Sequence, residues 1–245
     1  MTERADLTEP TDLSERAGLA GLAPANPADL RERTDPAGLA DPANPAGLAS
    51  PANLTDPADL VHAALAFGFS HAARMDPATL RVRQEVRGMC AVDRCGSYGR
   101  CWVCPPGCGT LDDARATIAR YRTGLLVQTT GELDDPFDYD AMKAADERQQ
   151  RRLMEFRETL RARYPHLTAL GNGACTICAT CTYPSAPCRH PDQAVASMEA
   201  FGLVVSDTCA DNGLGYYYGP NTITYTGCYL LEPVNAWQDG PRPGR

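Results

Sequence analysis

Hydrophobic residues beyond about position 60 follow two spacings, one typical of helices and the other typical of strands. A stripe at helical spacing predicts a long helix over residues 138–164, and its members are Met142, Ala145, Leu153, Phe156 and Leu160. The segment 61–69 suits a short helix. Thr110 and Asp113 form a capping-box pattern, which predicts a further helix that continues to Tyr121.

Three other segments have the composition of strands. Residues 124–130 and 203–207 are short aliphatic runs, and residues 221–231 are rich in Thr, Tyr and Ile. The order of these elements predicts an α+β fold, in which packed helices accompany a small, mostly antiparallel sheet in one compact domain.

The beginning of the chain has a different composition. Units such as DPAGL and DPADL recur there, prolines occur every few residues, and aromatic residues are absent. Because such a segment can neither form a long helix nor bury much surface, we predict a disordered acidic tail over residues 1–58. The folded, cysteine-rich domain is expected at 59–236, followed by a disordered C-terminus at 237–245.

Charge and hydropathy exclude several classes of function. Residues 1–60 contain four Lys or Arg and eleven Asp or Glu, which accounts for −7 of the net charge of −8. The remainder is close to neutral and offers no basic surface for nucleic acid. No apolar run is long enough for a membrane helix, and the N-terminus lacks the features of a secretory signal. We therefore expect a cytoplasmic protein that binds neither nucleic acid nor membranes.

Eleven cysteines in a reducing compartment indicate metal or redox chemistry rather than disulfides. Four of them, Cys175, Cys178, Cys181 and Cys188, lie within fourteen residues, and the first three form C-x2-C-x2-C. This run is typical of [4Fe-4S] ligation, and the loop before Cys188 is long enough to return it to the same cluster. Zinc is the alternative, although all-cysteine zinc sites usually pair two C-x2–4-C units from separate segments.

A second group of five cysteines lies earlier in the chain. Since one cluster takes four thiolates, we assign Cys90, Cys95, Cys104 and Cys108 as ligands and leave Cys101 as the spare. Zinc remains an alternative here, as does a thioredoxin-type dithiol formed by Cys101 and Cys104. Two further cysteines, Cys209 and Cys228, suit buried core positions, unless one of them replaces an assigned ligand.

Three composite motifs in this chain resemble one known family. They are CAVDRCGSYGRCWVCPP, then CTICATCTYPSAPCRHP followed by SMEAFGLVV, and finally YYYGPNTITYTG. From about residue 62 to 234 the chain is similar to the predicted metal-binding protein family, domain of unknown function 2284. The resemblance implies one compact α+β domain with two cysteine-rich metal sites of iron–sulfur type. It carries over Cys90, Cys95 and Cys104 to the first site and all four cysteines of C-x2-C-x2-C-x6-C to the second. It implies a non-cysteine at position 101, and it brings no defined reaction.

Two clusters in one domain favour electron transfer. Arg189 is a candidate cofactor-binding residue that stabilises a reduced cluster. In the reductase version, Tyr217 or Tyr218 donates a proton to a small polar substrate, with Arg189 and His190 nearby.

The predicted binding partner follows from motifs that the sequence lacks. The sequence contains no nucleotide-binding motif, so the electrons must come from a redox partner protein. The alternative is a zinc or iron–sulfur module without catalysis, acting as an interaction partner, sensor or cluster carrier.

Overall fold

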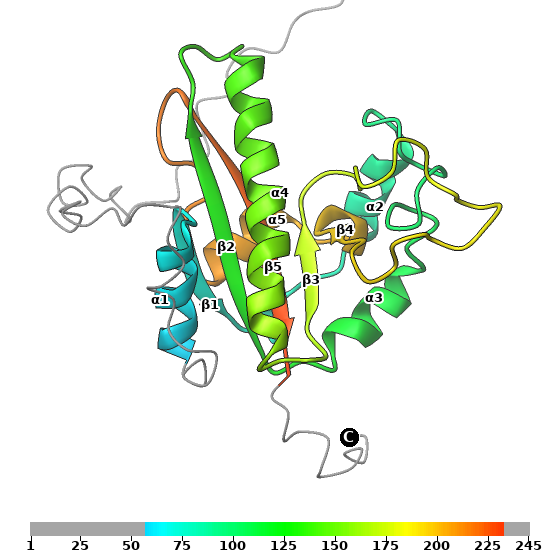
Figure 1. Cartoon of the computed structure of the whole chain (residues 1–245), viewed down its shortest axis with the longest axis horizontal. Helices are drawn as coiled ribbons and strands as arrows, with labels where there is room; N and C mark the ends of the chain where they lie inside the picture. The colour runs from blue at the N-terminus through cyan, green and yellow to red at the C-terminus, as the bar shows by residue number, and fades with distance from the viewer. Residues whose placement is uncertain (1–56, 233–245) are drawn as a thin grey trace, which may run out of the picture. The chain divides into compact units, whose positions relative to one another are not determined.

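A five-stranded sheet forms the centre of the computed structural model, which describes residues 57–232 (Figure 1). The segments predicted to be disordered lie outside this range, apart from the last two residues of the tail. In sheet order, the strands are β1 (His71–Met75), β2 (Thr123–Glu132), β5 (Thr222–Leu231), β3 (Thr168–Gly171) and β4 (Ala196–Ser197).

The two long central strands, β2 and β5, pair along their whole length. Their antiparallel register runs from Thr123 opposite Leu231 to Glu132 opposite Thr222. The β1–β2 and β3–β5 pairs are also antiparallel, and only β3 and β4 run parallel. The α+β prediction and the strands expected at 124–130 and 221–231 are therefore confirmed.

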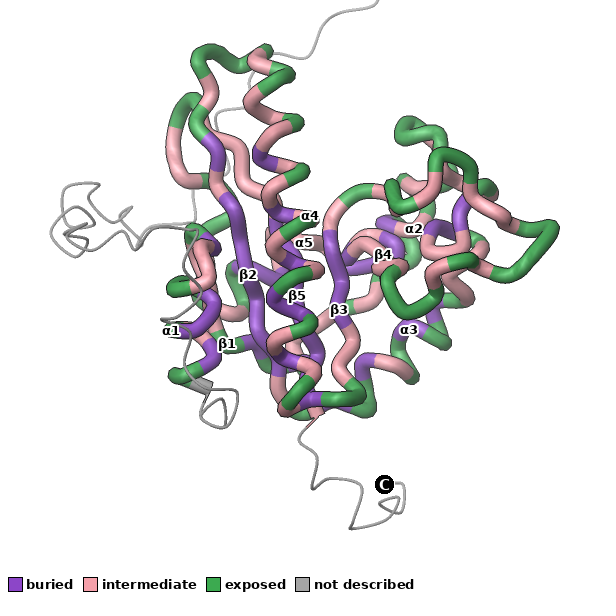
Figure 2. The backbone as a smooth tube through the Cα atoms, in the orientation of Figure 1, coloured by how far each residue is buried: buried purple, intermediate pink, exposed green. Residues whose placement is uncertain are grey.

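Both faces of the sheet are covered. Because successive residues of a strand point to opposite faces, Leu125 and Val127 of β2 contact the core formed with α1 (Pro57–Phe67) and α4 (Tyr139–Arg161). Leu126 between them belongs to a second core, which also includes residues of α3 (Leu111–Ile118) and the segment around η5 (Glu199–Phe201). Burial on both sides explains why the middle of β2 is continuously buried (Figure 2).

The predicted helices are confirmed with small shifts at their ends. Helix α4 covers residues 139–161, and all members of its predicted stripe are buried except Met142, which is partly exposed. Helix α3 starts with the predicted capping box and ends three residues before Tyr121. Helix α2 (Gln84–Ala91) was not predicted. Within residues 57–232, no helix combines the length and apolar character that a membrane crossing requires.

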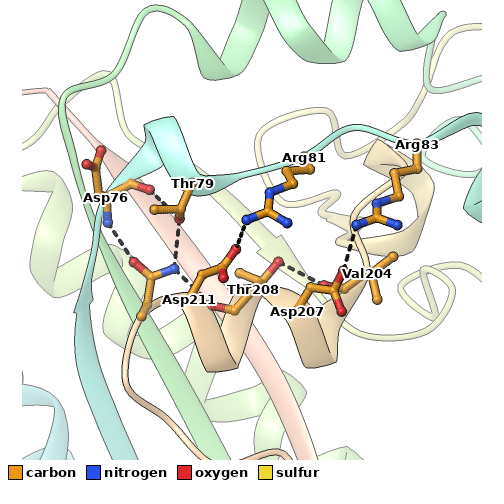
Figure 3. A network of polar contacts seen from close by, with 9 residues as sticks. Asp76, Thr79, Arg81, Arg83, Val204, Asp207, Thr208 and Asp211 are labelled. Atoms are coloured by element: carbon orange, nitrogen blue, oxygen red, sulfur yellow. Dashed lines mark hydrogen bonds and ion pairs between the residues drawn. The ribbon is translucent and has the colours of Figure 1, made fainter. Parts of the chain in front are cut away.

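The strand predicted at 203–207 is wrong. Only Leu203 forms an isolated bridge, with Val82, and helix α5 (Val205–Asp211) begins two residues later. Asp207 and Asp211 lie one turn apart on this helix and form ion pairs of 2.8 Å with Arg83 and 2.9 Å with Arg81 (Figure 3). The two partners of each ion pair lie far apart in the sequence, so the local aliphatic pattern around residue 203 does not reveal these contacts. Asn212 extends the network to Thr79 of η4 (Pro77–Thr79), with a hydrogen bond of 2.9 Å.

Candidate metal centre

The first thiol set consists of Cys90, Cys95, Cys104 and Cys108. Cys90 lies in the last turn of α2, and the other three lie on the loop that leads to α3. Cys90 interacts electrostatically with Cys95 and Cys108, and Cys104 interacts with the same two thiols. These four thiols therefore lie in one electrostatic neighbourhood, where Cys101 also acts on Cys104 and Cys108.

One cation, Arg87, lies beside the first thiol set. Burial raises the pKa of Cys90 and of Cys108, while the Arg87 guanidinium opposes both shifts. Its Nη1 donates to the Gly109 carbonyl over 2.9 Å. Its Nε is buried and has no hydrogen-bond partner among the described residues. A buried donor without an acceptor is unfavourable, so this position suits an additional anionic acceptor.

The second thiol set consists of Cys175, Cys178, Cys181 and Cys188, on the loop between β3 and β4. All four line a single cavity, which we call the thiol cavity, together with Arg189 and His190. The pKa of Cys181 is lowered, chiefly by the backbone N–H of Tyr183 and further by those of Trp102 and Thr182. Burial raises the pKa of Cys175, against the opposing effect of the Ile177 N–H.

Cys101 lies between the two sets. It is buried, lines the thiol cavity, and interacts with Cys181 of the second set. It also interacts with Cys104 of the first set, whose pKa rises to about 12 because of burial first and Cys101 second. The residue assigned as spare from the sequence is therefore the one that connects the two groups.

Two aromatic residues hold the cysteine loops together, and the loops lie side by side in Figure 1. The Trp102 indole N–H donates to the Ala186 carbonyl over 3.0 Å, and its ring meets the edge of Tyr183 at 4.9 Å between centroids. Gly107 fits tightly into this contact. A Cβ at this position would lie 2.5 Å from the Cys101 carbonyl oxygen and 2.9 Å from the Tyr183 ring.

The remaining residues predicted to bind a cofactor or to donate a proton differ in whether they line the thiol cavity. Arg189 lines the thiol cavity and donates to the Thr180 carbonyl over 2.9 Å, and His190 lines the same cavity. The tyrosines proposed as proton donors do not line it. Tyr217 is 68% exposed, and the Tyr218 hydroxyl donates to Gln128 Oε1 over 2.7 Å.

Cys209 and Cys228 are completely buried beside the sheet. Gln128 Nε2 lies 3.4 Å from the Cys209 sulfur, and Cys228 belongs to the second core. Neither lines the thiol cavity, which agrees with their interpretation as core residues.

The chemistry of the donors fits an anionic metal–thiolate centre. Each set supplies four thiols, the first has the unpartnered Arg87 Nε beside it, and the second has backbone N–H groups directed at Cys181. Within residues 57–232, no three His, Cys, Asp or Glu side chains converge closely enough to chelate a single ion. The four thiols of the second set instead line the thiol cavity.

Several residues of this region were not predicted from the sequence. Arg87 is three positions before Cys90 on one helix, a spacing that places both on the same face and is visible in the sequence RGMC. The roles of Trp102, Tyr183 and Gly107 depend on docking between distant loops, for which the sequence has no local signal.

Comparison with protein families tests the interpretation of these motifs. The model of the family described as predicted metal-binding protein, domain of unknown function 2284, matches residues 73–231. The chain belongs to this family. The match covers both thiol sets and the complete strands β2 to β5 of this predicted metal-binding protein. No curated protein and no solved structure matches the chain.

Proposed function

We propose that the two thiol sets hold two [4Fe-4S] clusters and that the protein transfers single electrons in the cytoplasm. The observation that carries this proposal is the position of Cys101, whose buried thiol lines the thiol cavity and interacts with two cysteines of each set. Electron transfer between metal centres requires short separation, and the docking of the loops through Trp102 and Tyr183 supports it. Electrons would enter from a redox partner protein.

The residues around the thiols have separable roles in this proposal. Bound clusters supply one-electron oxidation and reduction. Arg87 offers a buried N–H donor and a positive charge to the first set, which favours the more negative, reduced state. Backbone N–H groups do the same at Cys181, and Arg189 fixes the loop through the Thr180 carbonyl. Reduction of a small substrate at the second centre is a further step of the same proposal.

Zinc is the second candidate, because one observation favours it. The space enclosed by the thiol cavity is about 20 Å³, room for one water-sized sphere. A single zinc ion needs less room than a cluster of four irons and four sulfides. The loop 172–195, which carries these thiols, consists of exposed and partly buried residues, drawn green and pink in Figure 2. A zinc-bound form would serve as a non-catalytic binding module.

The metal content of anaerobically purified full-length protein tests both candidates. Two clusters predict about eight irons and about eight acid-labile sulfides per chain, with little zinc. About four of each would mean one cluster and would refute the two-cluster proposal. Zinc near one or two equivalents without sulfide would refute redox function and establish the binding module.

A further inference from the structure

The thiol cavity is lined by a fifth thiol besides the second thiol set, and this thiol belongs to Cys101. Its residue is 7% exposed and reaches the cavity from the loop that leads to α3. A [4Fe-4S] cluster takes four thiolates, and each thiol set supplies four without Cys101. The Cys101 thiol is therefore free to keep its hydrogen when both centres are bound.

The Cys101 side chain is hydrogen-bonded to one cysteine of each set. The pKa of Cys181 is lowered first by the Tyr183 N–H and also by the Cys101 side chain, which is therefore the donor in that pair. Burial raises the pKa of Cys104 to about 12, and both the charge of Cys101 and a hydrogen bond with it add to this effect. A bond that favours the neutral form of Cys104 makes Cys104 the donor in the second pair. Without metal, the bonds therefore run from Cys104 to Cys101 and from Cys101 to Cys181.

Metal binding changes which of these sulfurs can donate. The thiolate is the form that binds metal, so Cys104 and Cys181 lose their hydrogens as ligands. Both sulfurs can then only accept. Cys101 lies between them with one S–H for two acceptors.

We propose that the single S–H of Cys101 serves both centres and donates to whichever of Cys104 and Cys181 belongs to the centre that has received an electron. This inference rests on the proposed iron–sulfur function. A hydrogen bond to a ligand sulfur favours the more negative, reduced state of a cluster. The electron comes from the redox partner protein, and the hydrogen stays bonded to Cys101, so only its acceptor changes. Cys101 is thus a positioning residue and not a ligand.

One donor for two centres has a consequence for their midpoint potentials. The first electron is easier to add, because the S–H strengthens its bond at the centre that receives the charge. The second electron gains no such bond, since the S–H is already engaged. Cys101 therefore raises the higher of the two midpoint potentials and leaves the lower one unchanged.

A dithionite titration of the anaerobically purified full chain, followed by EPR, measures both midpoint potentials. Cys101→Ala should lower the higher midpoint by about 59 mV, a tenfold change in the ratio of reduced to oxidised centre, since a hydrogen bond to a charged group is lost. At the lower midpoint this ratio should change less than about threefold. Cys101→Ser keeps a hydroxyl donor and should lie closer to the parent than Cys101→Ala does. Cys209→Ser is the control, because Cys209 is buried outside the thiol cavity, and both of its midpoints should match those of the parent.

A general disturbance of the fold would move both midpoints together, so equal shifts in Cys101→Ala would overturn the inference, as would no shift at all. Circular dichroism checks that each variant is folded. If Cys101→Ala does not fold, Cys101→Val and Cys101→Thr take its place. These two side chains have the same shape and differ in the hydroxyl donor, so equal midpoints in both would also overturn the inference.

Iron and acid-labile sulfide, determined on every preparation, separate this inference from the proposed function. Clusters at the parent's level in Cys101→Ala with unchanged midpoints would refute the role of Cys101 and leave the iron–sulfur function intact. Loss of iron from folded Cys101→Ala would make Cys101 a ligand and would likewise overturn the inference. A parent protein without sulfide would refute the iron–sulfur function itself, and the role of Cys101 with it.

Discussion

The contact between the two cysteine loops is tested most sharply by Gly107→Ala. A Cβ at position 107 would lie 2.5 Å from the Cys101 carbonyl oxygen and 2.9 Å from the Tyr183 ring. Ordinary contacts begin near 3.4 Å, so the Cys101 backbone on the same loop must shift by roughly 0.9 Å and the Tyr183 ring on the other loop by roughly 0.5 Å. Neither neighbour is the end of a flexible side chain, since one is backbone and the other packs against Trp102.

Overpacking of this kind costs about 1–3 kcal/mol. For a domain of this size, the expected fall in melting temperature is between about 2 and 12 °C. Because Cys101 and Cys181 interact across the same contact, the variant should also retain less metal at the second set. Thermal unfolding by circular dichroism, combined with iron and zinc analysis of the same preparation, measures both effects.

Gly88→Ala is the matched control. Gly88 lies in α2 near the first thiol set, and a Cβ there meets nothing within 4 Å. This variant should be more stable than the parent by about 0.5–1 kcal/mol, since alanine favours a helix over glycine. If Gly107→Ala unfolds within about 1 °C of the parent and retains full metal, the described loop contact is wrong.

The other predictions concern single sites. Cys181→Ser should lose the metal of the second set while Cys209→Ser retains it, as metal analysis will show; equal loss in both would contradict the ligand assignment. In metal-free protein near pH 8, iodoacetamide should modify Cys181 well before Cys104, because backbone N–H groups lower the pKa of Cys181 while burial raises that of Cys104 to about 12. Peptide mass spectrometry measures this order, and the reverse order would refute it. Phe156→Ala should cost about 3–5 kcal/mol in urea unfolding and the exposed Glu155→Ala less than about 0.5 kcal/mol; similar costs would contradict the core packing.

The elements that the sequence predicted correctly are those with long periodic patterns. The stripe of α4 spans five turns or more, and β5 combines Thr, Tyr and Ile with burial in its second half. Short elements contain too few residues for a recognisable hydrophobic periodicity. Strand β3, with four residues, was not predicted. The aliphatic run at Leu203 was predicted as a strand, although a helix follows there and Asp207 and Asp211 on it form ion pairs.

The candidate centre shows the same division. Its candidate ligands could be selected from the sequence, because the spacing of Cys175, Cys178 and Cys181 is the one that a single cluster would require from one loop. The position of Cys101 between the two sets was not predictable, since it depends on the packing of Trp102 against Tyr183, which are more than eighty residues apart in the sequence.

The central claim is that two metal clusters lie close together in this protein. The most direct measurement is the EPR spectrum of anaerobically purified, dithionite-reduced full-length protein. The account predicts a broadened, split signal from two reduced clusters that interact magnetically, with a simpler spectrum in Cys181→Ser. A single unsplit signal of about one spin per chain, or no signal from protein that contains zinc, would contradict it.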